Sequence, residues 1–159
     1  MTNDLIKPYN NDPELGHLST PISDSAFVRT FIQNLPAYRK GLSPLMRGLE
    51  VGLAHGYFLV GPEIIYGAMR DYDQAPYFAG FVTAIALVLL GTIGMNVYGV
   101  ANCKSADESP VGTDKLKTSE GWSEFTAGFF IGGTGGAYMA YLLLDHFTTV
   151  DAIFRGFVN

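Results

Sequence analysis

Two ionisable side chains, Glu50 and His55, stand five residues apart in a mostly apolar stretch. An ionisable group inside a membrane-spanning helix costs free energy, so it indicates a functional site by default. A neutral imidazole can donate a nitrogen lone pair to a metal held in a macrocycle, and a carboxylate binds hard ions such as magnesium. On a helix, five residues rotate the side chain by about 500°, or about 140° beyond one full turn. The two groups therefore suit two separate ligands better than one shared metal.

Both residues also have plain structural explanations. His55 could hydrogen-bond a neighbouring helix, and Glu50 could form an ion pair with Arg47. Proton movement by a small membrane enzyme or transporter is disfavoured, because a proton relay needs a chain of ionisable groups. The other two apolar segments, 78–100 and 125–144, contain no Asp, Glu, His, Lys or Arg. The residue types alone leave ligand binding and structural pairing both open.

Three helices must position these groups. Ser43 followed by Pro44 is a helix-start signal, and the first helix is predicted over 44–68, about 37 Å long, with a kink or an early end at Pro62. The charge-free segments 78–100 and 125–144 each reach or exceed the roughly 20 residues that cross a bilayer. Only 16% of the residues are charged, against about 25% in soluble domains. The predicted fold class is an all-α integral membrane protein with three transmembrane helices plus a short N-terminal amphipathic helix, in a single domain.

The predicted amphipathic helix covers 24–35, with Asp24 as its cap, and could lie in the membrane interface or on a partner protein. It belongs to a cytoplasmic arm, 1–43, whose first 22 residues are predicted to be extended and which lacks the features of a signal peptide. Basic residues set the orientation. Eight flank the membrane on the side of the arm and of the loop 102–121, and only Arg70 and Arg155 lie on the other side. The N-terminus is therefore predicted to be cytoplasmic, with the tail 145–159 on the opposite side.

Glycines recur every fourth residue in the first and third predicted helices. The two rows are Gly48, Gly52 and Gly56, and Gly128, Gly132 and Gly136. Small residues at this spacing let helix backbones approach closely in lipid. We expect these rows to form contact faces between the two helices, or between either helix and another subunit or a flat pigment. Packing within the chain alone is an equal alternative.

Long strings of residues resemble one family. The strings are 11–25, 34–57 and 116–130, and the second contains G-L-E-V-G-L-A-H-G at 48–56. They are similar to subunit XI of photosystem I, the PsaL family, of cyanobacterial type. The resemblance extends over nearly the whole chain, including the tail 150–159. It implies a non-catalytic, three-helix thylakoid protein with a cytoplasmic N-terminus and a lumenal C-terminus. The net charge of −5 makes nucleic acid an unsuitable partner.

The resemblance also implies ligands and partners. The family's glutamate and histidine in that motif are chlorophyll magnesium ligands, and they correspond to Glu50 and His55. Chlorophyll a and beta-carotene are the implied pigments, with a further chlorophyll held through water. The implied partners are lipids, other photosystem I subunits and the same subunit in neighbouring photosystem I units, joined as trimers or tetramers. A pigment-free membrane scaffold is the alternative function.

A calcium ion at the lumenal side of the oligomer interface is a further implication of the family. The matching acidic position is Asp71, in the turn 70–74. Other members have proline three residues earlier, where this chain has Ala68. A carboxylate suits calcium, and a solvated acidic turn is the alternative.

Overall fold

The computed structural model describes residues 5–73, 75–110 and 114–157. The chain divides into two compact units, Met1–Gly41 and Leu42–Asn159, called here the N-terminal unit and the helical unit. Some predicted segments extend outside the described residues. They are residues 1–4 of the arm, Gln74 of the acidic turn, residues 111–113 of the second loop and residues 158–159 of the tail.

The N-terminal unit begins with a small hairpin rather than the extended arm that the prolines predicted. Strands β1 (Lys7–Pro8) and β2 (Leu18–Ser19) pair antiparallel and enclose the 3-10 turns η1 (Tyr9–Asn11) and η2 (Pro13–Leu15). The Asp12 side chain caps η2 by accepting a hydrogen bond from the Glu14 amide, at 3.0 Å. Gly16 then adopts a φ of 61°, a left-handed conformation that glycine reaches without steric cost. These local hydrogen bonds turn the chain back on itself.

Helix α1 (Ala26–Asn34) is capped by Ser25, whose side chain accepts a hydrogen bond from the Val28 amide. The prediction that Asp24 caps this helix is wrong, because Asp24 instead forms an ion pair with Arg29. The helix is amphipathic as predicted. Phe27 and Phe31 lie on its apolar side and are strongly exposed within this unit.

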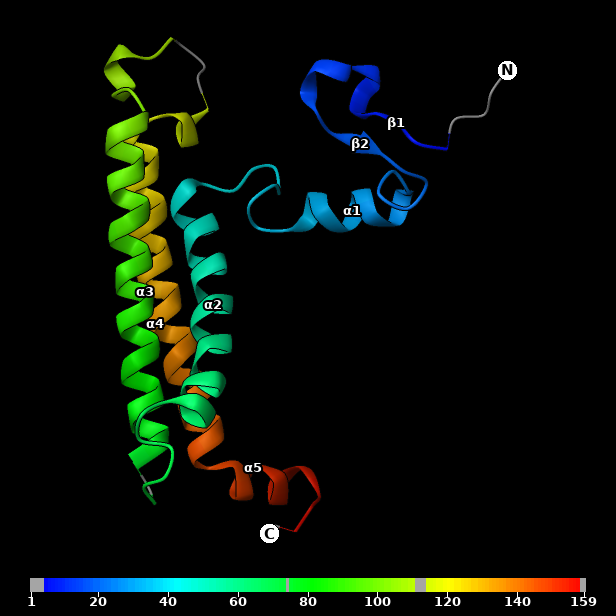
Figure 1. Cartoon of the computed structure of the whole chain (residues 1–159). Helices are drawn as coiled ribbons and strands as arrows, with labels where there is room; N and C mark the ends of the chain where they lie inside the picture. Colours follow the sequence, from blue (N-terminus) through cyan, green and yellow to red (C-terminus); the bar gives the residue numbers. More distant parts are fainter. Residues whose placement is uncertain (1–4, 74, 111–113, 158–159) are drawn as a thin grey trace. The chain divides into compact units, whose positions relative to one another are not determined.

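The helical unit is built from three long helices that lie side by side, followed by a short one (Figure 1). They are α2 (Pro44–Tyr66), α3 (Ala75–Asn102), α4 (Ser119–Asp145) and α5 (Phe147–Phe154). Ser43 caps α2 as predicted, accepting a hydrogen bond from the Met46 amide at 3.3 Å. The helix continues past Pro62 to Tyr66, so Pro62 does not end it early. Two further 3-10 turns, η3 (Ala106–Glu108) and η4 (Lys115–Lys117), lie between α3 and α4.

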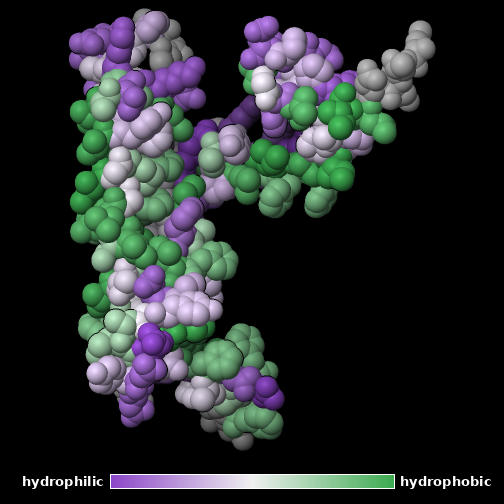
Figure 2. Space-filling view, in the orientation of Figure 1, coloured by the Kyte–Doolittle hydropathy of each residue, from purple (hydrophilic) through white to green (hydrophobic). Residues whose placement is uncertain are grey.

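Among the described residues, two helices are long and apolar enough to cross a membrane, α3 and α4. Both are longer than the charge-free segments from which they were predicted. Figure 2 shows apolar residues along much of α3 and hydrophilic residues toward both ends of the helical unit. This distribution fits helices placed in an apolar layer with polar surfaces on either side.

Small residues form the core where the three long helices meet. Val60 of α2, Ala84 of α3, and Ala137 and Ala140 of α4 are buried there. Aromatic rings pack α3 against α4 on either side of this core: Phe81 stacks on Tyr141, with ring centroids 5.2 Å apart, and Trp122 lies against Gly99. The two helices run antiparallel, because Trp122 near the start of α4 meets the end of α3.

Helix α5 occupies part of the segment that the sequence predicted only as a tail. His146 separates it from α4 with a φ of −108° and a ψ of 24°, so the helical path is interrupted at that residue. The chain then continues in a new direction, and α5 extends outward from the end of α4, away from α3 (Figure 1).

Candidate functional site

His55 lies on an exposed face of α2, with its ring held at two points. Its Nδ1 is 2.8 Å from the carbonyl oxygen of Val51, one turn earlier in the same helix. A carbonyl oxygen only accepts hydrogen bonds, so Nδ1 must carry the proton. In the neutral ring the lone pair is then on Nε2, the nitrogen suited to coordinate a metal. The structure therefore selects one tautomer.

The surroundings of His55 are apolar. The Phe129 ring of α4 lies against the imidazole, with centroids 5.7 Å apart and planes inclined by 58°. A shallow hollow of about 310 Å³ is lined by His55, Ala54, Phe58 and Leu59. This face of α2 therefore combines one nitrogen donor with an apolar lining. Sequence reasoning did not identify Phe129, although it follows Gly128 in the predicted contact row.

Glu50 is half-buried, one turn and a half before His55 on α2. Like His55, it lies in the part of α2 that packs along α4. Both residues lie within the one continuous helix α2, so their five-residue spacing corresponds to a rotation of about 140° beyond one full turn.

The two glycine rows lie against each other. A Cβ at Gly48, Gly52 or Gly56 would come within 3.0 Å of α4 backbone atoms, at Phe125, Phe129 and Gly133 respectively. Conversely, a Cβ at each glycine of the second row would come equally close to the α2 backbone. The pairs are Gly128 with Leu45, Gly132 with Leu49 and Gly136 with Leu53. Because the residue numbers rise together, α2 and α4 run parallel, with their backbones in direct contact.

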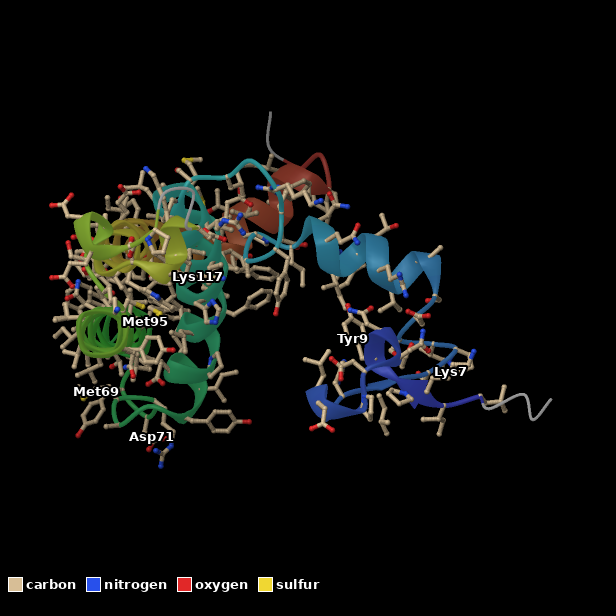
Figure 3. All side chains as sticks on the ribbon, turned by 90° about the horizontal axis from the view of Figure 1, so that it is seen from above. Lys7, Tyr9, Met69, Asp71, Met95 and Lys117 are labelled. Carbon is tan, nitrogen blue, oxygen red and sulfur yellow. The ribbon has the colours of Figure 1, made fainter. Side chains whose placement is uncertain are left out.

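Asp71 lies in the turn between α2 and α3, at the margin of the helical unit (Figure 3). Its side chain is 78% exposed and lies 3.7 Å from the Arg70 guanidinium. The described residues contain no group of three or more His, Cys, Asp or Glu side chains that could hold a metal ion. Within the part of the chain that the structure describes, Asp71 is therefore not part of such a group of side chains.

These features define a class of protein, a helical protein with two helices apolar enough to cross a membrane, a closely packed parallel helix pair and a histidine exposed beside it. Residues 5–149 match the model of the family described as photosystem I reaction centre subunit XI, PsaL. The chain belongs to this family.

Relatives match almost end to end. The photosystem I reaction center subunit XI of Thermosynechococcus vestitus is 55% identical over 159 residues, which is 100% of both chains. The Synechocystis protein of the same name is 54% identical over 158 residues, covering 99% of this chain and 98% of the relative. The Trichodesmium erythraeum protein is 57% identical over 155 residues, covering 98% and 94%. The family assignment therefore applies to the whole chain.

Proposed function

We propose that this chain is a non-catalytic subunit of photosystem I in the thylakoid membrane, which binds chlorophyll a through His55 and Glu50. The orientation of His55 carries the proposal. Hydrogen bonding of Nδ1 to the Val51 carbonyl leaves the Nε2 lone pair for a magnesium ion, on an apolar face. Bound chlorophyll would absorb light and pass on its excitation. His55 and Glu50 would hold the pigment's magnesium, and the Val51 carbonyl and the Phe129 ring would keep the imidazole oriented.

We infer three membrane crossings, with α2 as the first. Helix α2 contains Arg47, Glu50 and Glu63, and it is not one of the two helices that are apolar enough to cross a membrane by composition. The packing of α2 supports its assignment as a membrane crossing. From Gly48 to Gly56 it lies against residues 125–133 of α4, and so at the same depth as an apolar spanning helix. The parallel α2–α4 pair and the antiparallel α3 fit a chain that reverses at each surface. Basic residues then place the N-terminus in the cytoplasm and the C-terminus in the lumen.

Assembly is the second part of the proposed function. We infer contacts with other photosystem I subunits, with lipids and with the same subunit of neighbouring units, in trimers or tetramers. Because the glycine rows are occupied by the α2–α4 contact, their role in assembly is to keep this pair compact. Other surfaces of the chain must make the contacts with its neighbours. Beta-carotene would lie against the apolar outer faces.

A calcium ion at Asp71 needs ligands from elsewhere. One exposed carboxylate does not provide the six to eight oxygens that calcium takes. We propose Asp71 only as one contributor, with the remaining oxygens supplied by backbone carbonyls, water or an adjoining subunit.

Replacing His55 tests the pigment proposal. In complexes purified from cells carrying His55→Leu, we expect a loss of about one chlorophyll per copy of the chain, because leucine has no donor for magnesium. Absorbance and pigment extraction measure this. His146→Leu is the matched control, since His146 is exposed beside Asp145 at the end of α4.

Two other results would point to different conclusions. Unchanged chlorophyll content in His55→Leu, with normal assembly, would favour a pigment-free scaffold, for which the closely packed helices alone are sufficient. Equal loss in His146→Leu would mean that the pigment is lost through general damage.

A further inference from the structure

An apolar groove of about 490 Å³ lies where α2, α4 and α5 meet. Helix α2 contributes Tyr57, Phe58 and Gly61, and α4 contributes Leu143 and Leu144. Among the described residues that line the groove, none carries a charge. The groove is separate from the hollow beside His55, although Phe58 borders both.

Helix α5 turns one apolar stripe toward this groove. Phe147, Val150 and Phe154 recur at i, i+3 and i+7 and all line it. Phe147 is 61% exposed and Phe154 is 87% exposed, so the stripe is only partly covered by the chain itself. Asp151 and Arg155 hydrogen-bond to each other at 2.9 Å and do not line the groove. A short helix with an apolar stripe and a polar flank is typical of a membrane interface.

We propose that this groove holds one acyl chain of a membrane lipid, bent around the junction of α4 and α5. The inference rests on the proposed membrane topology, which puts the groove at the edge of the hydrocarbon layer. The groove is continuous with exposed surface of α2 at Tyr57 and Phe58, which this topology places in lipid. An acyl chain can enter from the bilayer without carrying a polar group into the groove.

The shape of the site favours a flexible occupant. Helix α5 extends outward from the end of α4, away from α3 (Figure 1), and the direction changes at the single residue His146. A ligand that touches both α2 and the α5 stripe must bend at this point. An acyl chain bends by rotating its single bonds, whereas a carotenoid is a rigid rod and would be stopped by α5.

Gly61 offers a clean way to fill the groove. A Cβ at Gly61 would have no heavy atom within 4 Å, so a larger side chain can enter the groove without displacing the backbone. Gly135 of α4 has the same open surroundings, is exposed and does not line the groove. Gly61→Leu and Gly135→Leu therefore add the same side chain to a spanning helix, inside and outside the site.

The test is photolabelling of the purified photosystem I complex in vesicles. The vesicles contain a phosphatidylcholine with a diazirine in the middle of one acyl chain, and labelled peptides are mapped by mass spectrometry. We expect labelling of α5 and of Phe58 in the unmodified complex. Gly61→Leu should lower this labelling at least fivefold, and Gly135→Leu should leave it unchanged. Val150→Phe fills the groove from α5 and should act like Gly61→Leu, should that variant fail to assemble.

Each other outcome overturns the inference. If the amount of label on α5 is unchanged in both Gly61→Leu and Val150→Phe, lipid contacts α5 only outside the groove. Label on exposed α3 residues such as Leu90, without any on α5, would overturn the groove while leaving the three-span topology intact. Absence of label from both helices would overturn the topology as well. Loss of carotenoid without loss of lipid label in Gly61→Leu would identify a pigment as the occupant.

Discussion

At the scale of single residues, the absence of side chains matters as much as the presence of His55. The Gly132 Cα lies so close to the Leu49 carbonyl of α2 that any Cβ would overlap it. Gly133, its neighbour, lies against the side chain of Val88 on α3 instead of against backbone. Backbone atoms cannot move aside as a side chain can, because a whole helix must shift with them. Gly132 is thus the more restrictive of the two positions.

We predict that Gly132→Leu separates α2 from α4 and impairs assembly. Overpacking of this kind costs about 1–3 kcal/mol, and more where only backbone can yield. We expect the yield of assembled complex to fall by roughly tenfold, which corresponds to about 1.4 kcal/mol. The size and amount of the native complex on a mild-detergent gel measure this.

Gly135→Leu is the control for that experiment as well, because its Cβ would have open surroundings. Normal complexes at normal yield in Gly132→Leu would show that the α2–α4 contact can relax, contrary to our account. An equal loss of assembled complex in both variants would mean that the added leucine itself, and not the close approach of the α2 and α4 backbones, causes the loss.

At the scale of elements, the start of α4 depends on Thr118. This side chain is 5% exposed, and its hydroxyl accepts a hydrogen bond from the Gly121 amide at 3.1 Å and donates one to the Lys115 carbonyl at 2.7 Å. One hydroxyl therefore caps α4 and ties it to η4. A buried donor or acceptor left without its partner is costly, so this capping site is sensitive to substitution.

Thr118→Val keeps the shape of the side chain and removes both hydrogen bonds. Loss of a helix N-cap costs about 0.5–2 kcal/mol, so local opening at residues 119–122 should become roughly tenfold more frequent. Hydrogen–deuterium exchange of the amides in that first turn measures the change. Thr118→Ser retains the hydroxyl and should restore protection. Unaltered exchange in Thr118→Val would show that the Thr118 hydroxyl does not stabilise the start of α4.

At the scale of the whole molecule, the proposed three crossings would place two loops on opposite sides of the membrane. Cys103 is the single cysteine of the chain, and Cys103→Ser gives a background for site-directed labelling. Asp107 in η3 and Tyr72 in the turn after α2 are both exposed. They are equivalent reporters for the two loops.

In sealed thylakoid vesicles with the cytoplasmic surface outward, a membrane-impermeant maleimide should label Asp107→Cys at once. It should reach Tyr72→Cys only after the membrane is opened by detergent. Gel shift of the labelled chain measures both. Immediate labelling of both cysteines would put the two loops on the same side of the membrane. Helix α3, which joins these loops, could then not cross the bilayer.

Much of this molecule follows from local chemistry. The Ser43–Pro44 signal predicted where α2 begins, and the charge-free segments predicted the central parts of α3 and α4, which begin three and six residues earlier than predicted. The glycine spacing predicted which helix faces are small, because such signals act within one helix. Local competition explains two errors. Ser25 and not Asp24 caps α1, because Asp24 forms an ion pair with Arg29, and hydrogen bonds around Asp12 fold a segment that was predicted to be extended.

The sequence by itself determined the family, the long apolar helices and the two ionisable residues of the candidate site. Only the tertiary structure decided that the glycine rows meet each other, that Phe129 lies against His55, and that α5 folds beside α2 and α4 to form a groove. The physical reason is the range of the interactions. Capping and hydropathy depend on neighbours within a few residues, whereas backbone contact between α2 and α4 joins residues more than seventy positions apart.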